Sequence, residues 1–199
     1  MKSDTGTRQL TAKGRATRDR IVAGGADIQR AAEVKSPSQL YHYFGDKRTL
    51  VQAVIQYQTE QVLAFQRPLL SRLDSFESLQ AWRDAVVEVQ RARNCEGGCP
   101  LGSLAAELSD VDPGAREQLM AGYGQWEDAV RDGLASMRER GELDAAADPG
   151  RLALALLTAL QGGLLMTQNR RDTLALEAVL DAMIDRIRIH AVTQRTPAA

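Results

Sequence analysis

The chain has 199 residues, of which 44% are hydrophobic and 26% charged, and its net charge is −1. This is the balance of a globular protein with one or two domains. Its two cysteines exclude the disulfide framework of a small secreted domain. The N-terminus has no apolar core of a signal peptide, and the most apolar stretch, residues 153–166, is interrupted by Thr158 and Gln161 and is too short to span a bilayer. We therefore expect a cytoplasmic protein with no membrane segment.

The net charge conceals an asymmetry along the chain. Residues 1–48 contain ten Lys or Arg against five Asp or Glu, whereas the remaining residues contain fifteen against twenty-one. A basic head on an acidic body is typical of a protein whose first domain binds nucleic acid and whose second domain does not.

The basic head begins with residues 1–16, which we expect to form a flexible basic arm because they carry no periodic apolar face. The next residues predict three short helices, which begin near residues 17, 26 and 38. Pro37 disfavours helix at Ser36 and so predicts a turn between the second and third of them.

The acidic body predicts helices throughout, since no alternating β-branched run occurs in it. Asp46 is expected to cap a long helix that ends before Pro68, and Asp74 with Glu77 to form the capping pattern of the next helix. A short helix follows over residues 101–108. The sequences Asp-Pro-Gly at 112–114 and 148–150 are matching helix starts. The last two helices are predicted over about 149–169 and 173–191, with Gly163 allowing a close approach between them.

A short motif joins the head to the body. Residues 39–50 read QLYHYFGDKRTL, with the polar aromatic residues Tyr41, His42 and Tyr43 held between Leu40 and Phe44. Lys47 and Arg48 follow in the first turn of a helix, where cations oppose the helix dipole and therefore favour an anionic partner. Tyr, His and Lys are ordinary ligands of DNA phosphates.

This motif resembles the end of the helix-turn-helix in transcriptional repressors of the TetR family. The stretches GCPLGSLAAEL (98–108) and ALLTALQGGLLMTQNRRD (155–172) resemble the ligand-binding domain of the LmrA/YxaF-like branch of that family. The resemblance implies an all-α fold, in which a small N-terminal helix-turn-helix unit joins a larger helical bundle that dimerises. It implies a DNA-binding domain over 17–48, a ligand-binding and dimerisation domain over 49–191 and a tail over 192–199.

The first helix of the chain is shorter than the pattern of this family. Ile21 and Leu40 are 19 positions apart, which is less than the family spacing by roughly four helical turns. Two explanations remain open: a segment is missing from the sequence, or the DNA-binding domain is reduced.

The resemblance places the DNA contacts on the head. Residues near the start of the recognition helix would meet base edges, and the others would meet phosphates. These candidates are Thr17, Lys35, Ser36, Ser38, Gln39, Tyr41, His42 and Lys47. For the two serines, helix capping is an equally good interpretation.

The resemblance also implies a pocket for a small hydrophobic or aromatic effector. Aromatic, Met and Gln side chains on the predicted bundle helices are its candidate lining, although each of them alone is as well explained by a packed core. They are Tyr57, Phe65, Trp82, Met120, Tyr123, Trp126, Gln161 and Met166.

No constellation of catalytic residues, metal ligands or cofactor-binding residues stands out, so we expect neither an enzyme nor a metalloprotein. The spacing of Cys95 and Cys99 is poor for zinc. The sequence predicts a dimeric repressor that binds operator DNA and is released by its effector. One alternative is a ligand-binding dimer that has lost DNA binding, and another is a thiol-based redox or electrophile sensor that uses Cys95 and Cys99.

Overall fold

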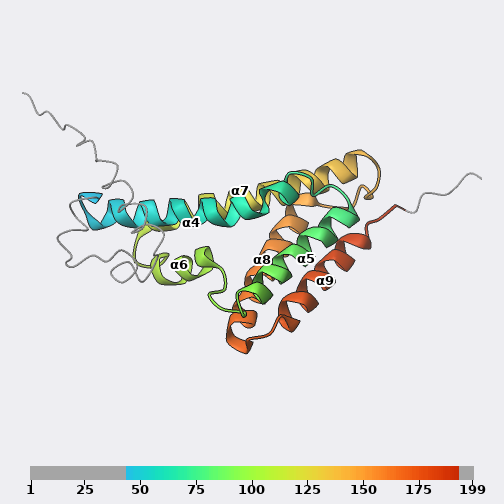
Figure 1. Cartoon of the computed structure of the whole chain (residues 1–199). Coiled ribbons are helices and arrows are strands. Elements are labelled where there is room, and N and C mark those ends of the chain that lie inside the picture. The colour runs from blue at the N-terminus through green and yellow to red at the C-terminus, as the bar shows by residue number, and fades with distance from the viewer. Residues whose placement is uncertain (1–43, 193–199) are drawn as a thin grey trace, which may run out of the picture. The chain divides into compact units, whose positions relative to one another are not determined.

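The computed structural model describes residues 44–192, so the predictions for the arm and for the three short helices lie outside the described residues. Six helices and no strand form in the described part, which agrees with the predicted all-α fold (Figure 1). The chain divides into two units, residues 1–58 and 59–199, and α4 begins in the first and ends in the second. The helices are α4 (Lys47–Leu70), α5 (Phe76–Ala92), α6 (Pro100–Leu108), α7 (Pro113–Glu139), α8 (Pro149–Arg170) and α9 (Leu174–Arg188).

The start of α4 follows the prediction, but its end does not. Gly45 has a φ of 73°, and the Asp46 carboxylate accepts the backbone N–H of Thr49 at 2.7 Å, which caps the helix. The helix then continues through Pro68 to Leu70, so the expected end before Pro68 is wrong. Pro68 lies in the last turn, where a single missing N–H removes one hydrogen bond and leaves the rest of the helix intact.

The other helix starts depend on side-chain caps. The capping box of α5 is made by Ser75 and Ser78, so the predicted pairing of Asp74 with Glu77 is wrong by one position. Asp112 and Asp148 cap α7 and α8 as expected, each with proline at the first helical position. The last two helices end within three residues of their predicted bounds.

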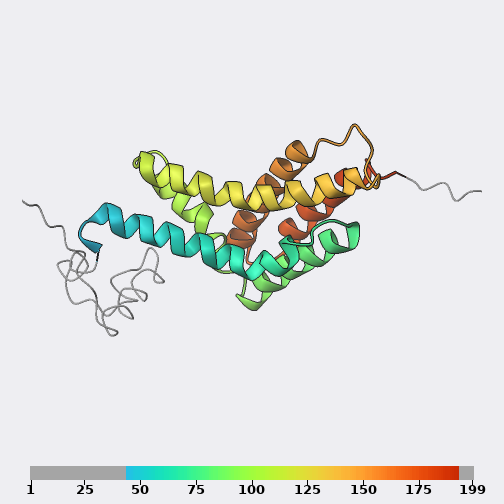
Figure 2. The same cartoon turned by 90° about the horizontal axis from the view of Figure 1, so that it is seen from above.

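The core of residues 59–199 forms around α8. Its most extensive contacts are with α9 and then with α7, and α9 also packs against α5 (Figure 2). A Cβ added at Gly163 would come within 2.8 Å of the Leu176 side chain and 3.0 Å of its Cα, so the glycine is needed for the predicted close approach of these two helices. Between α5 and α9, Arg83 makes two hydrogen bonds of 2.8 Å to Asp181.

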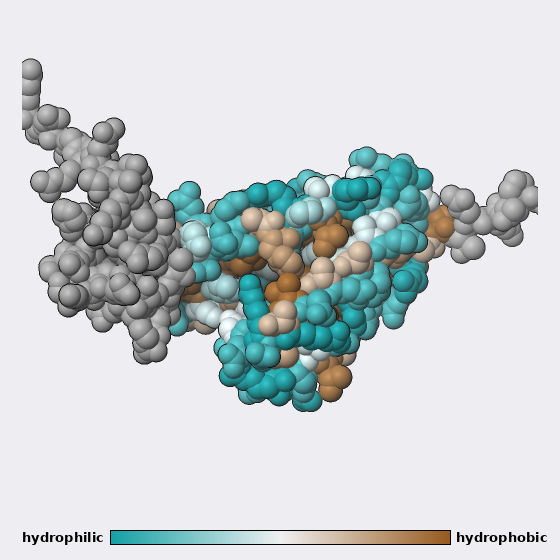
Figure 3. Space-filling model, in the orientation of Figure 1, coloured by the Kyte–Doolittle hydropathy of each residue, from teal (hydrophilic) through white to brown (hydrophobic). Residues whose placement is uncertain are grey.

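Helix α8 is apolar on more than one side. Its length and hydropathy alone would let it cross a membrane, although the shorter stretch 153–166 was expected to be too short. Nine of its residues are buried against the bundle, which is the pattern of a core helix. The outward side exposes Leu154 and Leu165, while α9 exposes Leu174. Elsewhere the surface is mostly hydrophilic on the face that Figure 3 shows.

Two glycines of α7 lie close to α4 and to the residues that follow it. A Cβ added at Gly122 would come within 2.9 Å of the Thr59 hydroxyl, and one at Gly133 would overlap the backbone carbonyl of Leu73. A third glycine of the same helix, Gly124, has nothing within 4 Å of the added atom. The backbone of α7 therefore approaches its neighbours closely at two of these three positions.

This difference gives a matched pair of substitutions within one helix. Gly133→Ala should lower the free energy of unfolding by about 1–3 kcal/mol, because the backbone at Leu73 must move to make room. Gly124→Ala should raise it by about 0.5–1 kcal/mol, because alanine is the better helix former and meets no neighbour. Urea unfolding followed by circular dichroism measures both values. Equal effects of the two substitutions would contradict the packing described for Gly133.

Candidate functional site

The interior of the helical bundle contains two tryptophans in different situations. Trp82 on α5 is buried, and its indole N–H donates to Gln66 Oε1 on α4 at 2.8 Å. The Gln66 amide donates in turn to the carbonyl of Val62 at 3.1 Å. Trp82 therefore fills the core and connects α5 to α4, and its N–H is not available to a ligand.

Trp126 on α7 is buried to the same degree, but its Nε1 has no hydrogen-bond partner within the described residues. The amide nitrogen Nε2 of Gln161 on α8 is a second buried donor that makes no regular hydrogen bond there, although it lies near the Cys99 sulfur, which is only a weak acceptor. A buried polar group without a hydrogen bond costs about 1–3 kcal/mol, so most such groups in proteins are satisfied by protein or by something bound. Each of these two donors, like the buried hydroxyl of Thr167, which also has no partner there, is therefore a candidate contact for a hydrogen-bond acceptor.

Gln161 of α8 lies close to residues of two other helices, α6 and α7. Gly102 in α6 is the position around which they meet, since a Cβ added there would lie 3.0 Å from Gln161 Oε1, 3.4 Å from Cys99 Cβ and 3.8 Å from Tyr123 Oη. Cys99 is the N-cap residue of α6, and Tyr123 lies on α7. The four residues Cys99, Gly102, Tyr123 and Gln161 form what we call the interior polar cluster.

The chemistry of this cluster is that of neutral hydrogen-bonding groups. Burial raises the pKa of the Cys99 thiol, so the thiol keeps its proton at neutral pH. Burial and then the neighbouring Cys99 raise the pKa of Tyr123 as well. The cluster can therefore offer uncharged donors and acceptors to a neutral ligand, but it does not contain an activated nucleophile.

The predicted ligand residues are only partly brought together. Tyr123 and Gln161 meet in the interior polar cluster, and Tyr57 is half-buried on α4 in the first unit. Phe65, Met120 and Met166 are 45%, 67% and 44% exposed, so they lie on the surface of this chain. The participation of all these residues in ligand binding stays a prediction.

Sequence reasoning did not select Cys99 or Gly102 as part of a ligand site. Both lie in the stretch 98–108 on which the family resemblance was based, and this was the available signal. A glycine inside a short helix is costly, and here its small size leaves room for the Gln161 amide.

The two cysteines are free and buried in the structure. They lie at opposite ends of a loop in which Asn94, Cys95, Gly97 and Gly98 all have positive φ values. Because reactive cysteines are partly exposed and have lowered pKa values, the burial of both thiols and the raised pKa of Cys99 do not favour a thiol sensor.

The predicted DNA contacts belong mostly to the N-terminal head of the chain. Thr17, Lys35, Ser36, Ser38, Gln39, Tyr41 and His42 all lie outside the described residues. Lys47 is the first residue of α4 and is exposed, and no residue in the described part pairs with its ammonium group. Its position at a helix N-terminus leaves it available to an anion.

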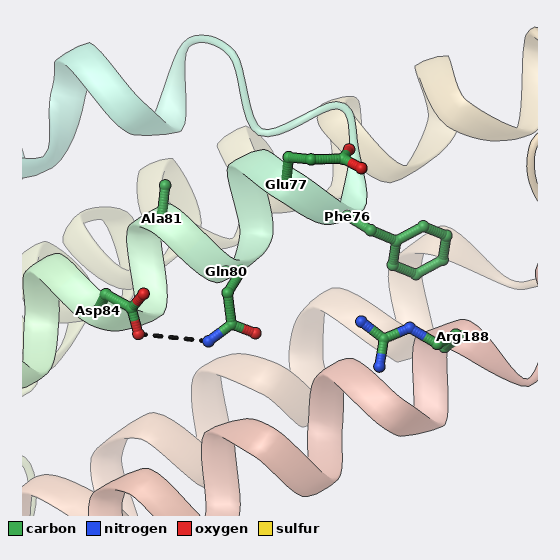
Figure 4. Close-up of a pocket in the computed structure, with 6 residues that line it drawn as sticks. All are labelled: Phe76, Glu77, Gln80, Ala81, Asp84 and Arg188. Atoms are coloured by element: carbon green, nitrogen blue, oxygen red, sulfur yellow. Dashed lines mark hydrogen bonds between the residues drawn. The ribbon is translucent and has the colours of Figure 1, made fainter.

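A surface groove between α5 and α9 is a weaker candidate for a ligand site (Figure 4). Its cation, Arg188, already faces the ring of Phe76 at 5.4 Å and pairs with Asp185 at 2.7 Å. Gln80 and Asp84 in the same groove bond to each other. The remaining polar group of the groove, the Glu77 carboxylate, is exposed, so the groove presents no buried unsatisfied group comparable with Trp126 Nε1 or Gln161 Nε2.

The different partners of the two tryptophans lead to a stability prediction. Trp82→Phe leaves Gln66 Oε1 unpaired in the core, whereas Trp126→Phe removes a donor that has no partner. Both substitutions lose similar apolar contacts, so Trp82→Phe should cost about 1–3 kcal/mol more of unfolding free energy than Trp126→Phe. Urea unfolding of the two variants gives the difference. A larger loss for Trp126→Phe would show that the indole N–H of Trp126 has a partner after all.

Comparison with known proteins shows which protein family the sequence matches. Residues 75–183 match the model of the tetracycline repressor-like C-terminal domain. A curated relative from Lactococcus lactis subsp. lactis, an uncharacterized HTH-type transcriptional regulator in the lacX 3' region, is 27% identical over 150 residues, which is 73% of each chain.

Solved structures of regulators have the same fold. A TetR transcriptional regulator from Chloroflexus aurantiacus is similar with a TM-score of 0.74 at 23% identity, over 91% of this chain and 98% of that one. A cysteine mutant of the TetR-family regulator CifR, solved in complex with 26-bp operator DNA, has a TM-score of 0.61 at 22% identity, over 89% of this chain and 97% of that one.

Proposed function

The chain belongs to the TetR family of transcriptional regulators, and from this premise we propose that it is a cytoplasmic repressor that leaves its operator DNA when an effector binds inside the bundle. The effector would be a small hydrophobic or aromatic molecule, and the protein would act as a homodimer without enzymatic activity. The observation that carries the proposal is the pair of buried, unpartnered donors, Trp126 Nε1 and Gln161 Nε2.

These donors define the class of effector. An apolar molecule alone would leave both N–H groups unsatisfied, whereas a planar molecule with a carbonyl oxygen would accept a hydrogen bond and fill apolar space at once. The interior polar cluster carries no fixed charge, since Cys99 stays protonated and Tyr123 neutral. A neutral aromatic ligand with at least one acceptor fits this environment best.

The proposal that the protein binds DNA rests on the head and on Lys47. The CifR structure shows a relative of the same fold on operator DNA, and the Lys47 ammonium group at the start of α4, which pairs with no described residue, is suited to a phosphate contact. The second interpretation, a ligand-binding dimer that has lost DNA binding through the shortened first helix, makes the opposite prediction for operator binding.

The outer sides of α8 and α9 support dimerisation, which is typical of the family. Leu154, Thr158, Gly162 and Leu165 follow one another along the exposed side of α8 at helical spacing. A Cβ at Gly162 would meet nothing in the chain itself, in contrast to Gly163. An apolar side with an open glycine allows a second copy to approach closely.

A physical connection exists between the cluster and α4. Tyr123 of the cluster follows Gly122, whose backbone lies close to Thr59 of α4 and to the Leu101 side chain of α6. Because these groups are closely packed around Gly122, an effector that displaces α6 or α7 would also displace α4. In this mechanism α4 transmits the displacement toward the head.

The experiment uses an operator selected from random double-stranded DNA and fluorescence anisotropy of the labelled site. Flavone has the required carbonyl acceptor, and 2-phenylnaphthalene has a similar shape without one. We expect flavone to weaken operator binding, and Gln161→Leu to reduce the affinity for flavone about tenfold or more through the lost hydrogen bond. The affinity for 2-phenylnaphthalene should not fall in this variant.

Three outcomes would count against the proposal. If no DNA sequence is selected, the interpretation without DNA binding is correct. If neither probe changes operator binding, the effector is not of this class. If Gln161→Leu leaves the response to flavone unchanged, Gln161 is not the polar contact.

A further inference from the structure

A pocket of about 280 Å³ lies where the α7–α8 connection meets the C-terminal end of α9. Its apolar part is made by Leu152 and Ala155 of α8 and by Met183 of α9. Arg151, Arg186 and His190 also line it. None of these residues belongs to the interior polar cluster, so the pocket is a separate site.

The two arginines of this pocket have no partner among residues 44–192. Neither guanidinium group makes a hydrogen bond or an ion pair within the described residues, and both side chains are exposed. The neighbouring Arg188 differs, since it pairs with Asp185 at 2.7 Å. Two guanidinium groups that line one pocket, and that form no ion pair with its one carboxylate, Asp148, are suited to an anion, because the planar group binds carboxylate and phosphate oxygens in pairs.

The other titratable groups of the pocket already make hydrogen bonds within the chain. His190 Nδ1 lies 3.1 Å from Asp144 Oδ1, which also accepts the backbone N–H groups of Ala146 and Ala147 at 2.9 Å each. The hydrogen bond from His190 is the main cause that lowers the pKa of Asp144. Asp148 accepts the backbone N–H of Arg151 at 3.1 Å as the cap of α8. Neither carboxylate forms an ion pair with Arg151 or Arg186.

We propose that this pocket binds a small organic anion, with its carboxylate between Arg151 and Arg186 and its apolar part against Leu152, Ala155 and Met183. The volume is near the lower end for ligand pockets, so it suits a molecule the size of an aromatic monocarboxylate. The apolar lining favours an organic anion over an inorganic one, since inorganic phosphate would leave this surface uncovered.

The pocket lies beside the surface that we assign to the dimer, so an anion bound there would affect how a second copy of the chain packs against it. It opens at the N-terminal end of α8 and the C-terminal end of α9, next to the outer sides that we assign to the dimer. Covering unpaired guanidinium groups with protein is unfavourable, whereas a bound carboxylate neutralises them. The residues of this site are separate from the interior polar cluster and from the proposed DNA contacts.

The test uses the full chain with methionine methyl groups labelled with ¹³C, titrated with benzoate. Benzamide is the neutral control of the same shape, and inorganic phosphate is the anion without an apolar part. We expect benzoate alone to shift the Met183 methyl signal to saturation, while the signal of Met120 on α7 stays in place. Arg151→Gln and Arg186→Gln should each weaken benzoate binding about tenfold. Arg116→Gln, which changes an exposed and unpaired arginine of α7, should have no effect.

Several results would overturn this proposal. If benzamide shifts the Met183 signal as benzoate does, the charge of the ligand does not contribute to binding. If phosphate shifts it equally, the apolar lining does not contribute. Unchanged binding in both pocket variants would place the site elsewhere. A Met183 signal that benzoate does not shift at all would indicate that a second copy of the chain closes the pocket.

Discussion

The packing of α8 is the constraint on which the rest of the structure depends. A helix of 22 residues with apolar side chains on more than one side must be covered on each of those sides. α9 and α7 cover two of them, and Gly163 lets α9 approach to within contact of the α8 backbone. The third side, with Leu154, Gly162 and Leu165, stays exposed in a single chain. A symmetric dimer is the arrangement that covers this side without any additional element.

The same helix places one polar side chain in an apolar interior. The amide oxygen of Gln161 lies close to Gly102 of α6, as do Cys99 and the Tyr123 hydroxyl. Leaving an amide N–H unpaired there lowers stability, which a binding site tolerates because the ligand supplies the missing acceptor. The close contact of Gly122 with Thr59 then makes α4 sensitive to the same region. In the proposed mechanism, stability, ligand recognition and transmission thus depend on neighbouring residues of one interface.

The sequence predicted the parts of this fold that have local causes. The Asp-Pro-Gly starts of α7 and α8, the Asp46 cap and the bounds of the last two helices are each set by a few adjacent residues. The end of α4 was wrong because a proline in a last turn costs too little to stop a helix whose apolar side is still packed. The partner of Trp82 could not be predicted, because Gln66 meets it only through the packing of α5 on α4. For the same reason, periodicity could not distinguish Trp82 from Trp126, although only one of them has a free donor.

We propose that an effector bound in the bundle interior weakens the affinity for operator DNA, and thermodynamic reciprocity tests this directly. The affinity for flavone should be measured by calorimetry on the free dimer and on the dimer saturated with its selected operator. If flavone weakens operator binding a hundredfold, it must bind the DNA complex a hundredfold more weakly, a coupling of about 2.7 kcal/mol. Equal affinities for the free and the DNA-bound protein would contradict the account, because they would mean that the interior site and the DNA site do not communicate.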